Sequence, residues 1–235
     1  MQLRVSFSVI SALNAVSTLA WPTRYVDNHQ PRADAASIMY VGNTGSNGTW
    51  GSNFHLIHED ELQNYQYLVE FVGQHTEGDW TVGLWNKIGR GGKQDGMFEE
   101  PATTFVLSPG ATQWVGIDSN SQGAWSAMEG DLFPRNSFGQ VMSTWGEFDF
   151  GDQKNGGWLG FDVSVIVAHR AGHSPEPMKI CVDSSDICSW WGFFAGETKE
   201  QSSYNSSNAD ADGIGGNLPS NSVKLRACIA WDGAE

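Results

Sequence analysis

Residues 144–150 read TWGEFDF, and the alternation in this stretch decides the fold. In an extended strand, successive side chains point to opposite faces of the sheet. Phe148 and Phe150 therefore share one face, while Glu147 and Asp149 share the other. The pattern predicts a strand that buries its aromatic face in a core and carries acidic side chains on its other face.

Residues 158–168 read WLGFDVSVIVA and predict a second strand, joined to the first by the Gly-containing loop 151–157. Its apolar face consists of Phe161, Val163, Val165 and Val167. Asp162 lies on the opposite face. If the two strands form a hairpin with their core faces matched, Glu147 falls directly opposite Asp162, with the two Cβ atoms about 4.5–5.5 Å apart.

The rest of the chain alternates short strand patterns with turns rich in Gly, Asn and Pro. Further strands are expected at 65–72, 80–85, 102–107, 113–117, 124–128, 178–181 and 223–231. Helical periodicity is almost absent, and the one competing interpretation is a helix over 59–72 that begins at an acidic cluster. Strand length and turn spacing favour an all-β, single-domain β-sandwich with long loops.

The N-terminus predicts export. Arg4 precedes an uncharged apolar run over 5–20, and Thr18 and Ala20 are the small residues expected before a cleavage site. The run is short for a membrane span, which needs ~20 strongly apolar residues, so a retained anchor is the less favoured alternative. We expect an extracellular protein with a signal peptide at 1–20, a flexible leader at 21–42 and a β-sandwich domain at 43–235.

The charge balance restricts the partners. The chain has 27 Asp and Glu against 13 Lys and Arg, a formal net charge of −14. Nucleic acid and anionic lipid repel such a chain, so we expect neither as a partner and favour a neutral polysaccharide. The sequence has no phosphate-binding, dinucleotide or Gly-x-Ser-x-Gly motif, and the histidine pairs His55/His58 and His169/His173 lack the carboxylate or cysteine that would complete a metal site. No cofactor and no metal are therefore expected.

The chain has three cysteines. Cys181 and Cys188 flank a polar, turn-like stretch, which favours a local disulfide between them with Cys228 left over. A bridge from either one to Cys228 is the alternative. Two sequons, at Asn47 and Asn205, lie in Ser-, Gly- and Asn-rich stretches and predict glycosylation in exposed loops.

The acidic face is the candidate site. Two facing carboxyl groups raise each other's pKa, so one can keep a proton and act as a general acid beside a carboxylate. Their spacing falls in the range of glycosidases, which makes Glu147 and Asp162 candidate catalytic residues. Trp145 and Trp158 offer rings for sugar stacking and, with Asp149, are candidate ligand-binding residues. The alternative is solvated acids and core tryptophans.

Six segments, in order along the chain, resemble one known family. They are TVGLWNK at 81–87, SNSQGAW at 119–125, TWGEFDFG at 144–151, GWLGFDVS at 157–164, MKIC at 178–181 and GIGGNLP at 213–219. The set is similar to the fungal secreted allergen family typified by Asp f 4. The resemblance implies an extracellular or wall-associated fungal protein, with host IgE as a partner, and it brings no established biochemical activity.

A more distant resemblance is to thaumatin-like proteins. It rests on Thr81-Val82 before Trp85, on Glu147-Phe148, on FDVS at 161–164 and on PMKI at 177–180. It implies a β-sandwich with an acidic cleft that in some members binds or cleaves β-1,3-glucan. Thaumatin-like proteins are rich in disulfides, whereas this chain has three cysteines. The chain also has Ser126-Ala127-Met128 where that family would have an arginine.

These observations predict a secreted protein that binds wall β-glucan through its acidic, aromatic face without catalysis. A weak β-1,3-glucan hydrolase that uses Glu147 and Asp162 is the alternative. A third hypothesis is an antigenic or interaction protein with no sugar ligand.

Overall fold

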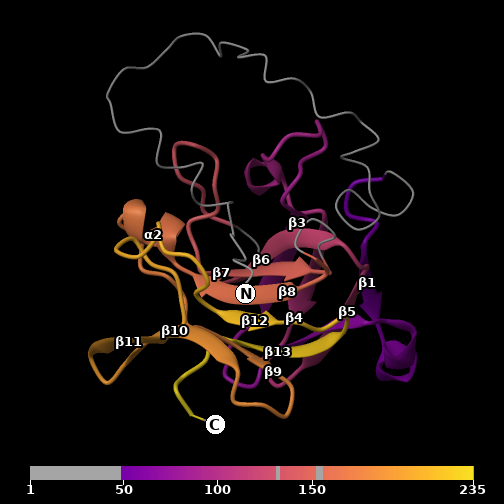
Figure 1. Cartoon of the computed structure of the whole chain (residues 1–235). Helices are drawn as coiled ribbons and strands as arrows, with labels where there is room; N and C mark the ends of the chain where they lie inside the picture. Colours follow the sequence, from indigo (N-terminus) through magenta and orange to yellow (C-terminus); the bar gives the residue numbers. More distant parts are fainter. Residues whose placement is uncertain (1–48, 131–132, 152–155, 235) are drawn as a thin grey trace.

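A computed structural model describes residues 49–130, 133–151 and 156–234 of the chain. This part forms two β-sheets that lie one above the other (Figure 1). The strands are β1 (Phe54–Ile57), β2 (Tyr67–Val72), β3 (Trp80–Asn86), β4 (Thr103–Leu107), β5 (Thr112–Ile117), β6 (Ser121–Glu129), β7 (Trp145–Phe150), β8 (Leu159–Ser164), β9 (Met178–Val182), β10 (Cys188–Phe194), β11 (Glu197–Gln201), β12 (Gly216–Leu218) and β13 (Val223–Ile229). The expected all-β sandwich is confirmed.

The seven-stranded sheet has the order β1-β5-β2-β13-β9-β10-β11. Its last strand in sequence, β13, lies in the middle and pairs in parallel with β2 and antiparallel with β9. The six-stranded sheet has the order β12-β8-β7-β6-β3-β4 and is antiparallel throughout. In this second sheet β7 lies between β6 and β8, and β8 lies between β7 and the edge strand β12.

The core lies between the sheets and is rich in aromatic rings. Trp125 of β6 stacks on Phe148 of β7 with ring centroids 5.8 Å apart, and Phe71 from the other sheet meets Trp125 edge-on at 5.3 Å. Gly146 faces the same ring, and a Cβ at that position would overlap the Trp125 indole. The glycine in TWGEFDF therefore makes room for a large core side chain, whose burial stabilises the fold by about 2–3 kcal/mol.

Helices are few and short in the described residues: 3-10 helices η2 (Glu59–Asn64) and η3 (Gly96–Phe98), and α-helix α2 (Ile166–Arg170). The single strand expected over 158–168 is wrong beyond Ser164. The chain turns into α2 there, with a backbone hydrogen bond from His169 to Val165. Ile166, Val167 and Ala168 are all buried, so the apolar run has no free face and a short run of this kind fits a strand or a buried helical turn equally well.

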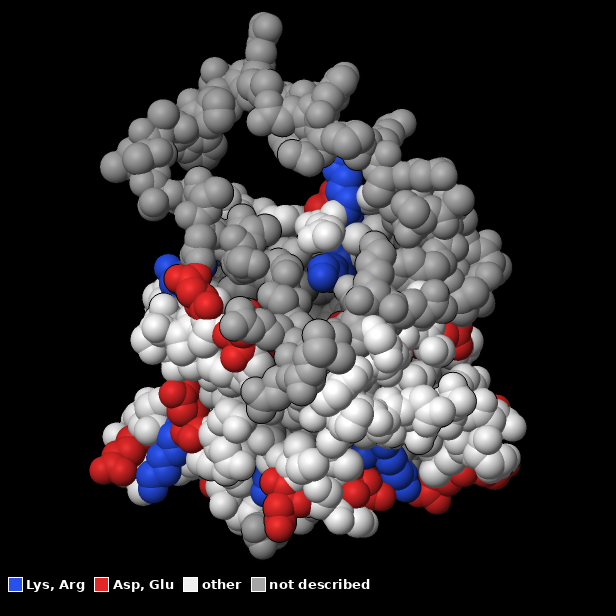
Figure 2. Space-filling view, viewed as in Figure 1, with Lys and Arg blue, Asp and Glu red and all other residues white. Residues whose placement is uncertain are grey.

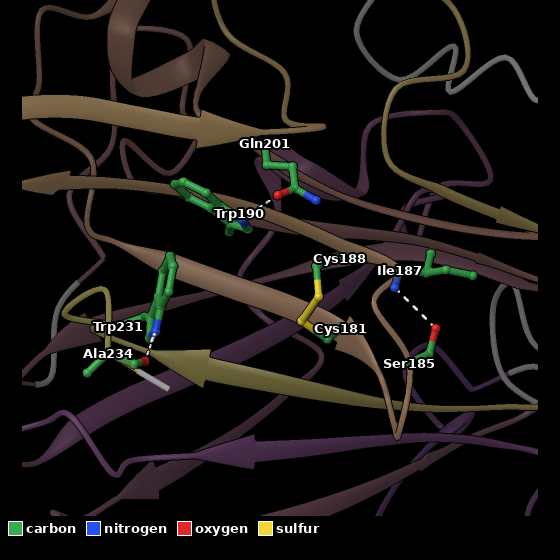
Figure 3. The surroundings of a disulfide bond; sticks show 8 residues. All are labelled: Cys181, Ser185, Ile187, Cys188, Trp190, Gln201, Trp231 and Ala234. Atoms are coloured by element: carbon green, nitrogen blue, oxygen red, sulfur yellow. Dashed lines mark hydrogen bonds between the residues drawn. A yellow bond between two sulfur atoms is a disulfide. The ribbon is translucent and has the colours of Figure 1, made fainter.

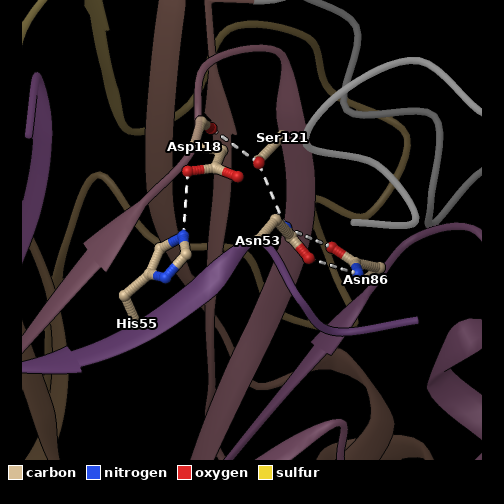
Figure 4. A network of polar contacts seen from close by, with 5 residues as sticks. All are labelled: Asn53, His55, Asn86, Asp118 and Ser121. Atoms are coloured by element: carbon tan, nitrogen blue, oxygen red, sulfur yellow. Dashed lines mark hydrogen bonds and ion pairs between the residues drawn. The ribbon is translucent and has the colours of Figure 1, made fainter. Parts of the chain in front are cut away.

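Polar side chains join the two sheets at one end (Figure 4). Asn53, which precedes β1, and Asn86, the last residue of β3, exchange two amide hydrogen bonds of 2.9 Å. Asn53 also donates to the hydroxyl of Ser121. His55 contacts the carboxylate of Asp118 at 2.9 Å. The side-chain amides of Asn53 and Asn86 are fully buried, so without these hydrogen bonds they would destabilise the contact between the two sheets.

Candidate functional site: a buried carboxyl pair

The antiparallel register of β7 and β8 pairs Glu147 directly with Asp162. Both side chains lie on the outer face of the six-stranded sheet, the face that points away from the seven-stranded sheet, because the flanking residues Phe148 and Phe161 point into the core. The expected apposition of the two carboxyl groups is therefore present in the fold. Glu147 is 2% exposed and Asp162 is fully buried.

The two carboxyl groups have no hydrogen-bond partner among the described residues. This holds for all four oxygens, Oε1 and Oε2 of Glu147 and Oδ1 and Oδ2 of Asp162. Burial raises the pKa of Glu147 to about 8, against a smaller lowering by the charge of Lys87. Burial also raises the pKa of Asp162 well above its ordinary range, and the charge of Glu147 raises it further. The pair therefore keeps at least one proton at neutral pH.

The acidic pair contrasts with the acids on the opposite side of the molecule. There, on the outer face of the seven-stranded sheet, Arg226 lies 3.6 Å from Glu70 and Lys224 lies 3.7 Å from Asp183. In Figure 2, basic and acidic side chains are interspersed along the lower part of the molecule, where the seven-stranded sheet lies. Exposed pairs of this kind are ordinary surface features, worth about 0–1 kcal/mol each. The desolvated carboxyl pair needs a different explanation.

A second polar row runs beside the pair on the same face. Asp149 pairs on one side with Gln122 of β6 and on the other with Gly160 of β8, which in turn pairs with Asn217 of β12. The Lys87 ammonium donates a 3.2 Å hydrogen bond to Oε1 of Gln122. Carboxyl, amide and ammonium groups therefore lie within one or two strand positions of Glu147 and Asp162.

Aromatic side chains flank the acids, although not as free platforms. Trp145 is 2% exposed, packs edge-on against Trp85 at 5.1 Å and donates its indole N–H to the Val141 carbonyl. Half-buried Trp50 packs on this cluster, and the Arg90 guanidinium lies 4.8 Å above its ring. The structure thus offers Trp50, rather than Trp145, to solvent beside the site. Trp158 is half-buried just before β8.

Tyr204 forms an isolated β-bridge with Ser164, the last residue of β8 and two residues after Asp162. Its hydroxyl donates to the Ala211 carbonyl and accepts from the Ile214 amide. Burial, followed by the charge of Asp162, raises the pKa of Tyr204 to about 12. The phenol therefore stays protonated and fastens the loop that leads into β12.

Trp50, Tyr204 and Asn217 are not among the residues singled out in the sequence. Trp50 lies in a Gly- and Ser-rich stretch without periodicity, and Tyr204 in a polar one. Asn217 belongs to GIGGNLP, a segment that does mark the family resemblance, but its neighbours in space depend on pairing with β8 more than fifty residues earlier. Within the described ranges, no three His, Cys, Asp or Glu side chains gather closely enough to hold a metal ion.

The disulfide joins Cys181 and Cys188 across the β9–β10 hairpin, as the turn-like stretch between them predicts (Figure 3). Cys228 is a half-buried free thiol. Asn205 is partly exposed, donates to the Glu200 carboxylate and accepts hydrogen bonds from Ser207. The other sequon residue, Asn47, lies outside the described residues, as do the expected signal peptide and leader.

In the part of the chain that the structure describes, no helix is long and apolar enough to cross a membrane.

Comparison with known proteins assigns the family. The profile of the Allergen Asp f 4-like domain matches residues 52–229, which include every strand from β1 to β13. The chain belongs to the Asp f 4-like allergen family. It is 40% identical over 190 residues to Allergen Asp f 4 of Aspergillus fumigatus, and the aligned region covers 81% of this chain and 58% of that protein. The chain thus spans little more than half the length of this relative.

Proposed function

We propose that this member of the Asp f 4-like family is a secreted protein that binds cell-wall β-glucan on the outer face of its six-stranded sheet. The observation that carries the proposal is the pair Glu147 and Asp162, whose four carboxyl oxygens are buried without a hydrogen-bond partner among the described residues. Buried polar groups are almost always paired, and a group kept unpaired at a stability cost is a candidate for function.

The chemistry of the site suits a neutral, hydroxyl-rich ligand. Sugar hydroxyls can donate hydrogen bonds to the carboxyl oxygens and accept a hydrogen bond from the carboxyl group that stays protonated. Trp50 supplies an apolar ring face at the edge of the site, and Lys87 and Gln122 add donors beside the acids. The formal net charge of −14 disfavours polyanions. A neutral wall polysaccharide has hydroxyl groups for the carboxyl pair, sugar faces for the Trp50 ring, and no negative charge.

Recognition by the host immune system is a separate expectation for a member of this family. The similar Aspergillus fumigatus protein is described as an allergen. We infer that this chain, if exported, presents related surfaces to the immune system and is bound by host IgE. Binding of patient IgE to the purified chain, compared with a heat-denatured sample, tests this inference independently of the glucan ligand.

A pull-down on insoluble β-1,3-glucan, with chitin as a second polymer, tests the main proposal. We expect the wild type to be retained on glucan and the doubly substituted Glu147→Gln, Asp162→Asn variant to be released. Glu197→Gln is the matched control, because Glu197 is an exposed acid on the edge strand β11. Absence of wild-type binding to either polymer contradicts a polysaccharide ligand, and equal retention of all three proteins moves the ligand to another surface.

A second function, weak β-1,3-glucan hydrolysis, is favoured by the spacing of the pair. Directly opposed residues place their Cβ atoms about 4.5–5.5 Å apart, which allows the ~5–5.5 Å carboxyl separation of retaining glycosidases. The raised pKa of Glu147, about 8, suits a general acid. Reducing-sugar release that Glu147→Gln abolishes would establish catalysis. If the wild type binds glucan but releases no reducing sugar, or if Glu147→Gln does not change the rate of release, the protein is a glucan-binding protein and the pair is not catalytic.

A further inference from the structure

The strand β12 brings an amide side chain to the acidic face. Asn217 pairs with Gly160, and Gly160 pairs with Asp149, so Asn217 and Asp149 lie on the same face with only a side-chain-free residue between them. The neighbouring row on β8 and β7 holds Asp162 and Glu147. Four polar side chains therefore lie close to Gly160 on this face: those of Asn217, Asp149, Asp162 and Glu147.

The glycines before Asn217 allow this placement. Gly215 has a φ of +101°, a backbone conformation that L side chains rarely adopt, and a Cβ there would overlap the Phe161 carbonyl and crowd Asp162. A Cβ at Gly216 would overlap the Phe161 ring. The chain therefore approaches β8 more closely than any side chain would permit. This close approach explains the segment GIGGN in terms of where it places Asn217.

The Asn217 amide makes a single side-chain hydrogen bond within residues 49–130, 133–151 and 156–234. Its Oδ1 is buried and accepts no hydrogen bond from any described residue, and its Nδ2 makes one long 3.4 Å bond to the Gly213 carbonyl. The same condition holds for the four oxygens of Glu147 and Asp162 next to it. Five oxygens on one small area of sheet therefore lack hydrogen-bond donors from the described part of the chain, and a ligand that donates several hydrogen bonds would satisfy them.

We propose that Asn217 is a ligand-binding residue of this site, which holds a hydroxyl group of a neutral sugar unit beside the carboxyl pair; this rests on the proposed function. An uncharged amide both donates and accepts, and its bonds do not change with pH. Next to three acids it favours a neutral hydroxyl and disfavours a uronic acid, whose carboxylate would meet Asp149, Asp162 and Glu147. The ligand class is therefore an uncharged glucan rather than an acidic polysaccharide.

Calorimetric titration with a soluble β-1,3-gluco-oligosaccharide tests the role of Asn217. We expect Asn217→Ala to bind about tenfold more weakly than the wild type, the effect of about one lost hydrogen bond, with an unchanged unfolding temperature. Asn64→Ala is the matched control, since Asn64 is an exposed amide at the end of η2, and it should bind like the wild type. An oligogalacturonide should not bind.

A second variant separates binding from folding. Asn217→Asp keeps the shape of the side chain but adds a charge among acids, so it should bind at least tenfold more weakly at pH 7. At pH 4 its protonated carboxyl again offers a donor and an acceptor, and most of the affinity should return. Recovery supports the proposal even if Asn217→Ala unfolds more easily, and failure to recover overturns it.

The remaining outcomes separate this inference from the function beneath it. If the wild type binds the oligosaccharide and Asn217→Ala binds equally well, the role of Asn217 is wrong and glucan binding stands. If the wild type does not bind, the proposed function fails and the role of Asn217 fails with it. Equal binding of oligogalacturonide overturns the selectivity for neutral sugars.

Discussion

Glu147 and Asp162 carry acidic side chains that face each other on neighbouring strands, out of water and without hydrogen-bond donors among the described residues. Two charges in this position would repel strongly, and burial would penalise each one separately. The fold tolerates the pair because a carboxyl group can take up a proton instead. The stability of the folded chain should therefore depend on pH, and substitution of Glu147 or Asp162 should change that dependence.

The free energy of unfolding should fall as the pH rises from about 4.5 to 8. The pKa of Glu147 is raised from 4.5 to about 8, so the folded chain holds a proton that the unfolded chain releases between these values. Stability is therefore fully present below about pH 4.5 and is lost as pH rises towards 8, by up to about 1.4 kcal/mol per pH unit for each proton. Glu147→Gln should flatten this decline and be more stable than the wild type at pH 8.

Urea denaturation at several pH values between 4 and 9 measures the effect. Glu197→Gln serves as the control, because this exposed residue should leave the curve unchanged. Parallel pH profiles for the wild type and Glu147→Gln would show that Glu147 titrates normally and would remove the electrostatic basis of the site.

At the scale of elements, the short strand β12 matters most, because it carries Asn217 on glycines that touch Phe161. Gly216→Ala should push β12 away from β8, destabilise the fold by about 1–3 kcal/mol through overpacking against a buried ring, and weaken glucan binding. Gly91→Ala is the control, since a Cβ at Gly91 meets nothing within 4 Å. Chemical denaturation and the glucan titration measure both effects. A Gly216→Ala variant with wild-type stability would contradict the close packing of β12.

The hairpin β9–β10 is held by its disulfide, which closes a short loop of sequence separation 7. Replacing Cys181 and Cys188 by Ala should cost about 2 kcal/mol of stability, the value expected for a loop of this size. Cys228→Ala, at a half-buried thiol, should cost less. The midpoints of guanidinium unfolding curves compare the variants. A larger loss for Cys228→Ala than for the double variant would show that the free thiol, and not the bridge, stabilises this sheet.

The elements differ in how far sequence alone predicts them. β7, with its regular alternation of apolar and polar residues, is predicted nearly residue for residue, and with it the pairing of Glu147 and Asp162. The run 165–168 fails because four consecutive apolar residues fit a buried helical turn as well as a strand. β11 and β12 show no pattern, since one is exposed along its whole length and the other is only three residues long and dominated by packing against β8.

At the scale of the whole molecule, the two ends of the described chain meet in one sheet. β13 lies between β2 and β9, so the last strand in sequence joins the early strands to the late hairpins. Sequence patterns predict β13 as a strand but not its place, because parallel pairing over more than 150 residues leaves no local signal. The acidic site is shaped by the same long-range order, which brings β12 to the edge of β8.

Truncation tests this arrangement. A chain that ends after Asn221 lacks β13, so β2 and β9 each lose one of their two partner strands and the seven-stranded sheet is split in two. This chain should not unfold cooperatively. A chain that ends after Asp232 keeps β13 and should fold. Near-ultraviolet circular dichroism during heating distinguishes the two, and a sharp thermal transition in the shorter chain would contradict a central role for β13.

The central claim is that the carboxyl pair itself meets a neutral glucan. The most direct measurement follows the side-chain carboxyl carbons of Glu147 and Asp162 by NMR while a soluble β-1,3-gluco-oligosaccharide is added. We predict that both signals move in a saturable way with one shared dissociation constant, while those of Glu197 and Glu200 on the exposed strand β11 stay in place. Saturable binding that leaves the Glu147 and Asp162 signals unmoved would contradict the claim, as would the absence of any shift.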